Sequence, residues 1–394
     1  MEQICPKDKC TGCSACMNAC NAGAITMVAD ECGYVYPEID GSLCVDCSLC
    51  AKVCPANVPP RQVYPLECHA VAVSDPAGLL SCASGGVATE LSRYVVDAGG
   101  VVYGCSGADM RDVHHERVDT AEGLEPLKGS KYVQSRIGMV YRSVRQDLQA
   151  GRQVLFIGTP CQVAGLYGFL RHKDYPNLLT ADLVCHGVPS QKMLSDNISY
   201  YCSKPGEEVA VQFRRKEKAS PKCDAPWRIA YGWFYKTIHM RAMRRVAYHK
   251  DPYMYGFLRA LTFRRSCYGC RYACIARCAD FTLGDFWGLG RNAGFNRGKG
   301  VSAVLVNTER AKDVWRSASA GCVSVGRDVV EALKGNGQLQ RPSRMHRNYA
   351  EFVALYPKRG LKYAVGRCLR LDFAMIALEE AKSKVAACLR RRQG

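Results

Sequence analysis

The body of the chain alternates short apolar runs with segments of helical periodicity, which is the pattern of an α/β domain. Apolar runs predict strands at 71–73, 101–104, 154–157 and 178–184. Apolar residues at helical spacing predict helices between Gly86 and Gly99, over 137–150 and over 162–171. Because a helix joins the strands at 154–157 and 178–184, we expect these strands to be parallel neighbours in a partly parallel sheet.

The remaining segments carry weaker patterns. Residues 227–240 and 301–306 predict further strands, whereas the polar and charged stretch 203–225 is predicted to be mobile. Prolines mark 58–66 as a linker that follows a first structural unit. From residue 346 onward the chain is basic and is predicted to be helical.

Cysteine spacing sets the first sixty residues apart. The pattern C-x₂-C-x₂-C-x₃-C occurs twice, at residues 10–20 and 44–54. In two-cluster ferredoxins, three thiolates come from one tight loop and the fourth cysteine of each run binds the other cluster. The spacing therefore predicts two [4Fe–4S] clusters, one on Cys10, Cys13, Cys16 and Cys54, and one on Cys44, Cys47, Cys50 and Cys20.

Zinc and disulfides are the alternatives to iron–sulfur clusters. Zinc sites favour paired C-x₂-C knuckles rather than runs of three cysteines plus one. The usual proline follows the second run as Pro55, whereas Asn21 replaces it after the first, and that proline is not a ligand. Cys5 and Cys32 lie outside the repeat and are interpreted as ordinary small side chains.

Composition supports metal or redox chemistry. The chain has 394 residues and 24 cysteines, which is long enough for more than one domain. It has no run of about 18 apolar residues to cross a membrane, and its first residues lack the apolar segment of a secretory signal. Because cysteines in a reducing compartment bind metals more often than they form disulfides, we expect a cytoplasmic protein.

The formal charge of +18 favours anionic partners such as cofactor phosphates or acidic carrier proteins. Cluster thiolates would lower that charge. The sequence has no RNP, zinc-finger or helix-turn-helix signature, so nucleic acid is not an expected partner. The basic residues near the C-terminal end fit a solvated helix better than contact with a membrane surface.

Several motifs beyond residue 80 follow one another in a fixed order: Ser84-Gly85-Gly86, Lys128 to Ser135, Phe156 to Val163, Cys185 to Ser190, Cys267 to Cys270, and Gly284 to Gly288. Together they resemble the coenzyme F420 hydrogenase/dehydrogenase beta-subunit family over roughly residues 68–325. Members with a fused two-cluster ferredoxin resemble the whole chain. The resemblance implies FAD, at least one further [4Fe–4S] cluster, a small-molecule or deazaflavin acceptor such as coenzyme F420, and room for a partner redox protein.

On this resemblance four segments are expected. Residues 1–60 form an α+β ferredoxin-like head, and an α/β body with a partly parallel sheet follows it. The body comprises the N-terminal part of the family domain at 61–150 and its C-terminal part at 151–345. Residues 346–394 form a basic helical tail.

Ser84-Gly85-Gly86 lies where the first helix of the body begins. Free N–H groups at a helix start attract anions, and glycines let phosphate oxygens approach the backbone. We therefore interpret this motif as the binding site of a cofactor phosphate. Lys128, Ser130 and Lys131 are expected to add charge to the same pyrophosphate.

Other candidate cofactor contacts lie in turns at the ends of predicted strands. Thr159 and Pro160 follow the strand at 154–157, and Asp285 and Trp287 follow Gly284, where the indole would stack on a ring or fill core. His186 is the candidate catalytic acid, because it lies near the same edge of the sheet.

A third cluster has two candidate ligand sets. Cys161 and Cys185 each follow a strand of the same βαβ unit, so both face the crevice at one sheet edge, where open α/β sheets bind ligands. They would complete a cubane with Cys267 and Cys270. The local Cys274 and Cys278 are the other completion. We favour the crevice set because it places the cluster beside the flavin site.

These features predict an oxidoreductase in which electrons pass through the two N-terminal clusters, a third cluster and FAD to coenzyme F420 or another organic acceptor, or in the reverse direction. The alternative is an electron-carrier subunit of a larger redox complex that has no substrate of its own.

Overall fold

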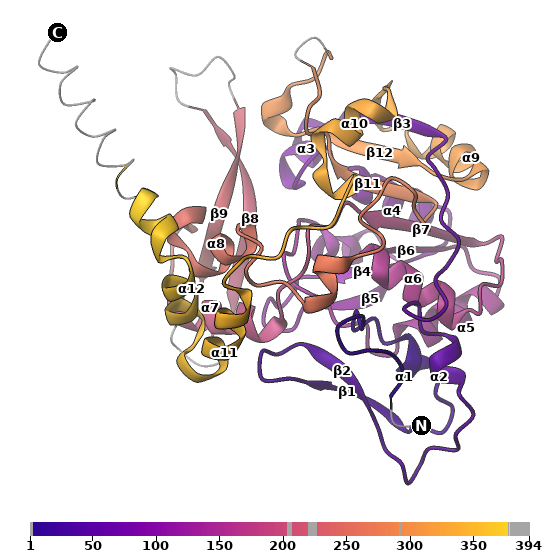
Figure 1. Ribbon diagram of the computed structural model, residues 1–394. Coiled ribbons are helices and arrows are strands. Elements are labelled where there is room, and N and C mark those ends of the chain that lie inside the picture. The colour runs from indigo at the N-terminus through magenta and orange to yellow at the C-terminus, as the bar shows by residue number, and fades with distance from the viewer. Residues whose placement is uncertain (1–2, 203–206, 220–226, 291–292, 377, 379–394) are drawn as a thin grey trace, which may run out of the picture.

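The computed structural model describes residues 3–202, 207–219, 227–290, 293–376 and 378. The head contains a two-stranded antiparallel sheet and two short helices (Figure 1). Its elements are α1 (Ala15–Ala19), β1 (Ile25–Ala29), β2 (Val35–Ile39) and α2 (Leu49–Lys52). Ser14 and Ser48 precede the two helices with left-handed φ angles of 62° and 58°, so both halves of the sequence repeat turn tightly in the same way.

The body is built on an eight-stranded mixed sheet with the order β13-β3-β12-β11-β7-β6-β4-β5. The strands β4, β6, β7 and β11 are parallel to one another, and the other pairs are antiparallel. This confirms the partly parallel α/β body and the predicted β6–β7 pair. The strands are β3 (Glu67–Val73), β4 (Val101–Ser106), β5 (His114–Val118), β6 (Val154–Gly158), β7 (Leu178–Leu183), β11 (Phe281–Asp285), β12 (Ser302–Val306) and β13 (Cys322–Gly326).

Helices cover both faces of this sheet. The helices α4 (Val87–Asp97) and α9 (Glu309–Ala318) share one apolar core with the sheet, while α5 (Val140–Gln149) and α6 (Pro160–Phe169) share another. Helix α6 begins at Pro160, two residues earlier than predicted, because Thr159 and Gln162 form a capping box around its start.

A second unit stands beside the sheet (Figure 1). It contains the antiparallel sheet β10-β9-β8 and four helices around a shared core. Its elements are α7 (Gln191–Tyr201), β8 (Val209–Lys218), β9 (Trp227–Thr237), β10 (Arg244–Ala247), α8 (Pro252–Leu258), α11 (Tyr349–Arg359) and α12 (Leu361–Cys368).

Strand β8 corrects the prediction that residues 203–225 are mobile. Val211 and Phe213 alternate with charged residues, face the core and pair with β9. The charged residues between them obscured a period of two. Residues 203–206 and 220–226 lie outside the described ranges, as do 377 and 379–394 of the predicted tail.

The remaining elements are short. They are the helices α3 (Pro76–Ser81) and α10 (Val329–Gly335) and the 3₁₀ turns at Glu122–Leu127, Tyr248–Lys250, Arg265–Gly269, Arg297–Lys299 and Gly337–Leu339. Within the described ranges, no helix combines the length and the apolar character needed to cross a membrane.

The head lies directly on helix α6. A Cβ atom on Gly168 would come within 2.2 Å of the carbonyl oxygen of Val53, so this position needs glycine. Asn18 donates a hydrogen bond of 2.8 Å to the carbonyl of Gly138. Arg142 donates to the carbonyls of Asn18 and Cys20 at 2.8 and 2.7 Å. These contacts fix the head against the α5–α6 layer.

Arg277 and Asp182 form a buried ion pair at the centre of the body, with 3.0 Å between Nη2 and a carboxylate oxygen. Replacing Arg277 with alanine would leave the carboxylate buried without a counter-charge. We expect Arg277→Ala to lower the free energy of unfolding by about 3–5 kcal/mol, measured by urea denaturation. The control Arg316→Ala removes an exposed pair with Asp313 and should cost less than about 1 kcal/mol. Equal losses in the two variants would contradict this account.

Candidate functional site

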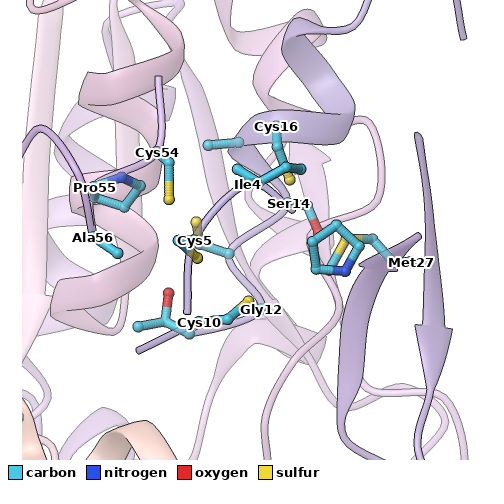
Figure 2. A pocket seen from close by; sticks show the side chains of 14 residues that line it. Ile4, Cys5, Cys10, Gly12, Ser14, Cys16, Met27, Cys54, Pro55 and Ala56 are labelled. Atoms are coloured by element: carbon cyan, nitrogen blue, oxygen red, sulfur yellow. The ribbon is translucent and has the colours of Figure 1, made fainter. Parts of the chain in front are cut away.

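Four of the predicted cluster ligands surround one pocket in the head (Figure 2). Cys10, Cys13, Cys16 and Cys54 line it, and it contains about 350 Å³ of space between atoms. The loop before α1 curls tightly, because Gly12 and Ser14 both adopt positive φ, and this turns three cysteines toward one centre. Burial raises the pKa of the Cys13 thiol to about 12, so a thiolate there requires a compensating cation such as iron.

Cys5 also lines this pocket, which the sequence interpretation as an ordinary small residue missed. Its thiol lies between Cys10 and Cys54 (Figure 2). Contact with Cys5 is the largest cause that lowers the pKa of Cys10 to about 6 and that of Cys54 to about 7. The sequence signal was Pro6, whose carbonyl accepts a hydrogen bond from the Cys10 backbone in the turn that returns the chain to Cys5.

The second predicted set is more open. Cys20 and Cys50 contact the small apolar core of the head. Cys44 and Cys47 lie on the preceding loop, where Cys47 is exposed. Burial raises the pKa of Cys50, and the neighbouring Cys47 and Cys44 thiols act in the same direction, which places the three close together.

Four cysteines from three segments meet at the crevice of the main sheet. Cys161 lies in the first turn of α6, Cys185 follows β7, and Cys267 and Cys270 lie in and after the 3₁₀ turn at Arg265–Gly269. Burial is the main cause that raises the pKa of each thiol, to about 12 for Cys185 and about 11 for Cys270. Cys161 contributes to the raised pKa of the other three. The structure therefore gathers the crevice set.

The alternative pair is oriented differently. The Cys274 thiol lies 3.4 Å from the carbonyl of Arg271 and 3.1 Å from that of Ala276. The Cys278 thiol faces the carbonyl of Pro160 at 3.9 Å. Cys278 is near Cys161, but Cys274 does not join the other thiols.

The head pocket and the crevice adjoin each other across helix α6. A Cβ atom on Gly165 would lie 2.9 Å from the Cys13 sulfur. Gly165 is four residues, about one helical turn, after Cys161. The Cys13 thiol also senses the charge of Cys161. Two candidate cluster sites, predicted from distant parts of the sequence, thus share one boundary.

One edge of the main sheet gathers further polar groups. The parallel strands β4, β6, β7 and β11 all end there, as does β3. Asp285, at the end of β11, forms a bidentate ion pair with Arg214 from β8 at 2.9 and 2.6 Å. The Lys216 ammonium, two residues further along β8, donates to the carbonyl of Ser84 at 2.6 Å. The second sheet therefore closes over this edge.

The glycines of Ser84-Gly85-Gly86 have a role in strand contact. A Cβ atom on Gly85 would lie 2.1 Å from the Val71 carbonyl oxygen, and Gly86 has a φ of 90°. Close approach to β3 and a left-handed turn therefore account for both glycines without a phosphate. The helix start remains next to Lys216, whose pKa burial lowers to about 8.

The predicted grouping of Ser84-Gly85-Gly86 with Lys128, Ser130 and Lys131 is wrong. Ser84 lies beside β12, and the Lys131 side chain lies beside Gly107 at the end of β4. These strands are four positions apart in the sheet, or roughly 19 Å. The two groups are too far apart to bind one pyrophosphate, because the prediction had no knowledge of strand order.

The lysines of that segment differ in their surroundings. Lys128 pairs with Glu125. The Lys131 ammonium donates to the carbonyls of Pro126 and Lys128 at 2.9 and 2.8 Å. Burial lowers the pKa of Lys131 to about 8. Ser130 precedes Tyr132 and interacts with its hydroxyl.

The other predicted contacts lie along the same edge. The Thr159 hydroxyl is 3.2 Å from the Cys161 sulfur, and Pro160 begins α6. Trp287 is 42% exposed. His186 is accessible to solvent, while the protein atoms crowded around its ring lower its pKa. A neutral imidazole at this position suits proton acceptance better than proton donation.

No three Cys, His, Asp or Glu side chains of the described ranges lie close enough to share one metal ion. A four-iron cluster is wider than a single ion, and its ligands surround it at larger separations. The converging thiols of the head pocket and of the crevice fit a group of that kind.

Comparisons with known proteins agree with the two-part organisation. Residues 9–58 match the 4Fe-4S dicluster domain. Residues 151–328 match the family described as the C-terminal part of the coenzyme F420 hydrogenase/dehydrogenase beta subunit. An uncharacterized ferredoxin of Methanocaldococcus jannaschii is 37% identical over 57 residues, which cover 14% of this chain and 73% of that ferredoxin.

A solved structure also has a similar chain. It is the F420-reducing [NiFe] hydrogenase complex from Methanosarcina barkeri, with 17% identity and a TM-score of 0.46 over 70% of this chain and 89% of that chain. The two sequence matches, with the cysteine geometry described above, show that this chain belongs to the coenzyme F420 hydrogenase/dehydrogenase beta-subunit family and carries a 4Fe–4S dicluster domain in its head.

Proposed function

We propose that this chain is an iron–sulfur flavoprotein oxidoreductase that passes electrons between a partner redox protein and an organic acceptor such as coenzyme F420. The observation that carries the proposal is the contact between Cys13 in the head and α6 one turn from Cys161. A ferredoxin head that only carried electrons elsewhere would not need its inner ligand loop against a second group of four cysteines.

The exposure of the two head sites gives the path a direction in space. The loop with Cys47 is open to solvent, so a partner redox protein would exchange electrons there. The site of Cys10, Cys13, Cys16 and Cys54 faces the body. Cys161, Cys185, Cys267 and Cys270 would hold a third [4Fe–4S] cluster at the crevice, and such clusters carry single electrons.

The sheet edge provides residues that fit FAD. Lys131 and Lys216 are largely buried, and neither appears among the ion pairs of the described residues, since both donate to backbone carbonyls. Buried cations without carboxylate partners suit phosphate oxygens. Bound FAD would exchange one or two electrons. Asp285 holds Arg214 in place beside this edge, and the accessible His186 would accept a proton from the substrate.

We expect the anaerobically reconstituted chain to contain about twelve irons and one FAD. Three sets of four thiols and the cationic sheet edge are the physical reason. Chemical iron analysis and the absorbance of the released flavin measure both. About eight irons with no flavin would contradict the proposal and leave an electron-carrier subunit.

The crevice ligands can be separated from the local alternative. Cys267→Ala/Cys270→Ala should lose about a third of the iron, because two of four ligands of one cubane disappear. Cys274→Ala/Cys278→Ala is the matched control and should keep its iron. The opposite pattern would assign the third cluster to Cys274 and Cys278.

Lys216 gives a test of FAD binding. Lys216→Met should weaken FAD binding to the chain by about tenfold, since a charged hydrogen bond is worth roughly 1.5–3 kcal/mol. The exposed Lys236 of β9 supplies a control, and Lys236→Met should bind FAD like the wild-type chain. Binding is followed by flavin fluorescence. Equal affinity in all three proteins would place the phosphates elsewhere.

A further inference from the structure

Arg264 lies fully buried between the head pocket and the crevice, with 1% of its surface exposed. Its Nε donates to the carbonyl of Cys10 at 2.8 Å, and its Nη2 donates to that of Val35 at 2.8 Å. The same Nη2 is 3.8 Å from the Cys10 sulfur, and Nη1 is 3.2 Å from Oε1 of Gln134. The guanidinium therefore lies against a predicted cluster ligand.

The backbone of Arg264 is tied to the crevice. Its N–H donates to the carbonyl of Val188 at 3.0 Å, in the loop that follows Cys185. Its own carbonyl accepts from the N–H of Cys267 at 2.9 Å. One residue thus contacts the segments that carry Cys10, Cys185 and Cys267.

The charge of Arg264 has no acidic partner among the described residues. No ion pair there includes it, although Arg277, the other arginine that is almost fully buried, pairs with Asp182. The rings of Tyr36 and Tyr34, with centroids 4.3 and 5.7 Å from the guanidinium carbon, compensate only part of the cost of burying a charge. A group of opposite charge must therefore complete this environment.

Thiolate-ligated clusters are the anions nearest to it. Within the proposed function, one cluster is held by Cys10 and its partners, and another by Cys161 and its partners. The Arg264 charge acts to lower the pKa of Cys10, after the larger effect of Cys5. It acts likewise on the Cys161 thiol against the larger effect of burial, which raises that pKa. Both candidate sites thus lie within reach of one cation.

We propose that Arg264 is the internal counter-cation of the inner head cluster, shared with the crevice cluster, and that it raises the reduction potential of the inner head cluster. Reduction adds one electron to a cluster, breaks no bond and makes the cluster more negative. A fixed cation in a medium of low dielectric stabilises that reduced state more than the oxidised state. Arg264 would thereby favour the flow of electrons from the exposed cluster inward.

The test is an anaerobic redox titration of the reconstituted full-length chain with dithionite, followed by electron paramagnetic resonance. Arg264→Gln should lower at least one cluster midpoint so that the equilibrium constant for reduction falls tenfold or more, which is about 59 mV for one electron. Arg264→Lys keeps the charge and should stay near the wild-type midpoints. Gln134→Leu removes neutral hydrogen bonds of the same interface and should also leave the midpoints in place.

Iron content is measured first in every protein. Wild-type chain without iron at the head or the crevice would overturn the proposed function itself. Full iron in Arg264→Gln with wild-type midpoints would overturn only the role of Arg264. If Arg264→Gln loses iron, retention of iron and midpoints by Arg264→Lys supports the charge. Loss of iron by both variants, or an equal midpoint shift in Gln134→Leu, would show that shape rather than charge matters.

Discussion

The contact between the Cys13 loop and helix α6 is the interaction on which the arrangement of the sites depends. It exists because α6 presents glycines where the head approaches, with Gly168 facing the Val53 carbonyl and Gly165 facing the Cys13 sulfur. Side chains at these positions would push the head away. Because Cys161 is one turn from Gly165, the same close approach that docks the head also joins its inner thiols to the crevice.

Burial of charge explains much of the remaining chemistry. The body carries cations in places where water is scarce: Lys131, Lys216 and Arg264 are buried and donate to neutral oxygens. Such groups are costly unless an anion completes them. Phosphates at the sheet edge and thiolate-ligated iron between head and body would do so. The formal charge of +18 is therefore partly an account of what the chain binds.

Features with local causes could be predicted from the sequence. The eight head cysteines follow from a repeated spacing, and the shared edge of Cys161 and Cys185 follows from one βαβ unit. Features that depend on tertiary structure could not. Strand order separates Ser84 from Lys131, and the chain reversal that returns Cys5 to Cys10 is a single turn. The partner of Arg264 exists only after docking.

The most direct measurement is X-ray diffraction on both sides of the iron absorption edge, from anaerobic crystals of the reconstituted chain. Our account predicts three groups of anomalous peaks, two in the head and one at the crevice. The crevice group should be enclosed by the sulfurs of Cys161, Cys185, Cys267 and Cys270. Iron bound by Cys274 and Cys278, or a crevice without iron in a chain whose head is loaded, would contradict it.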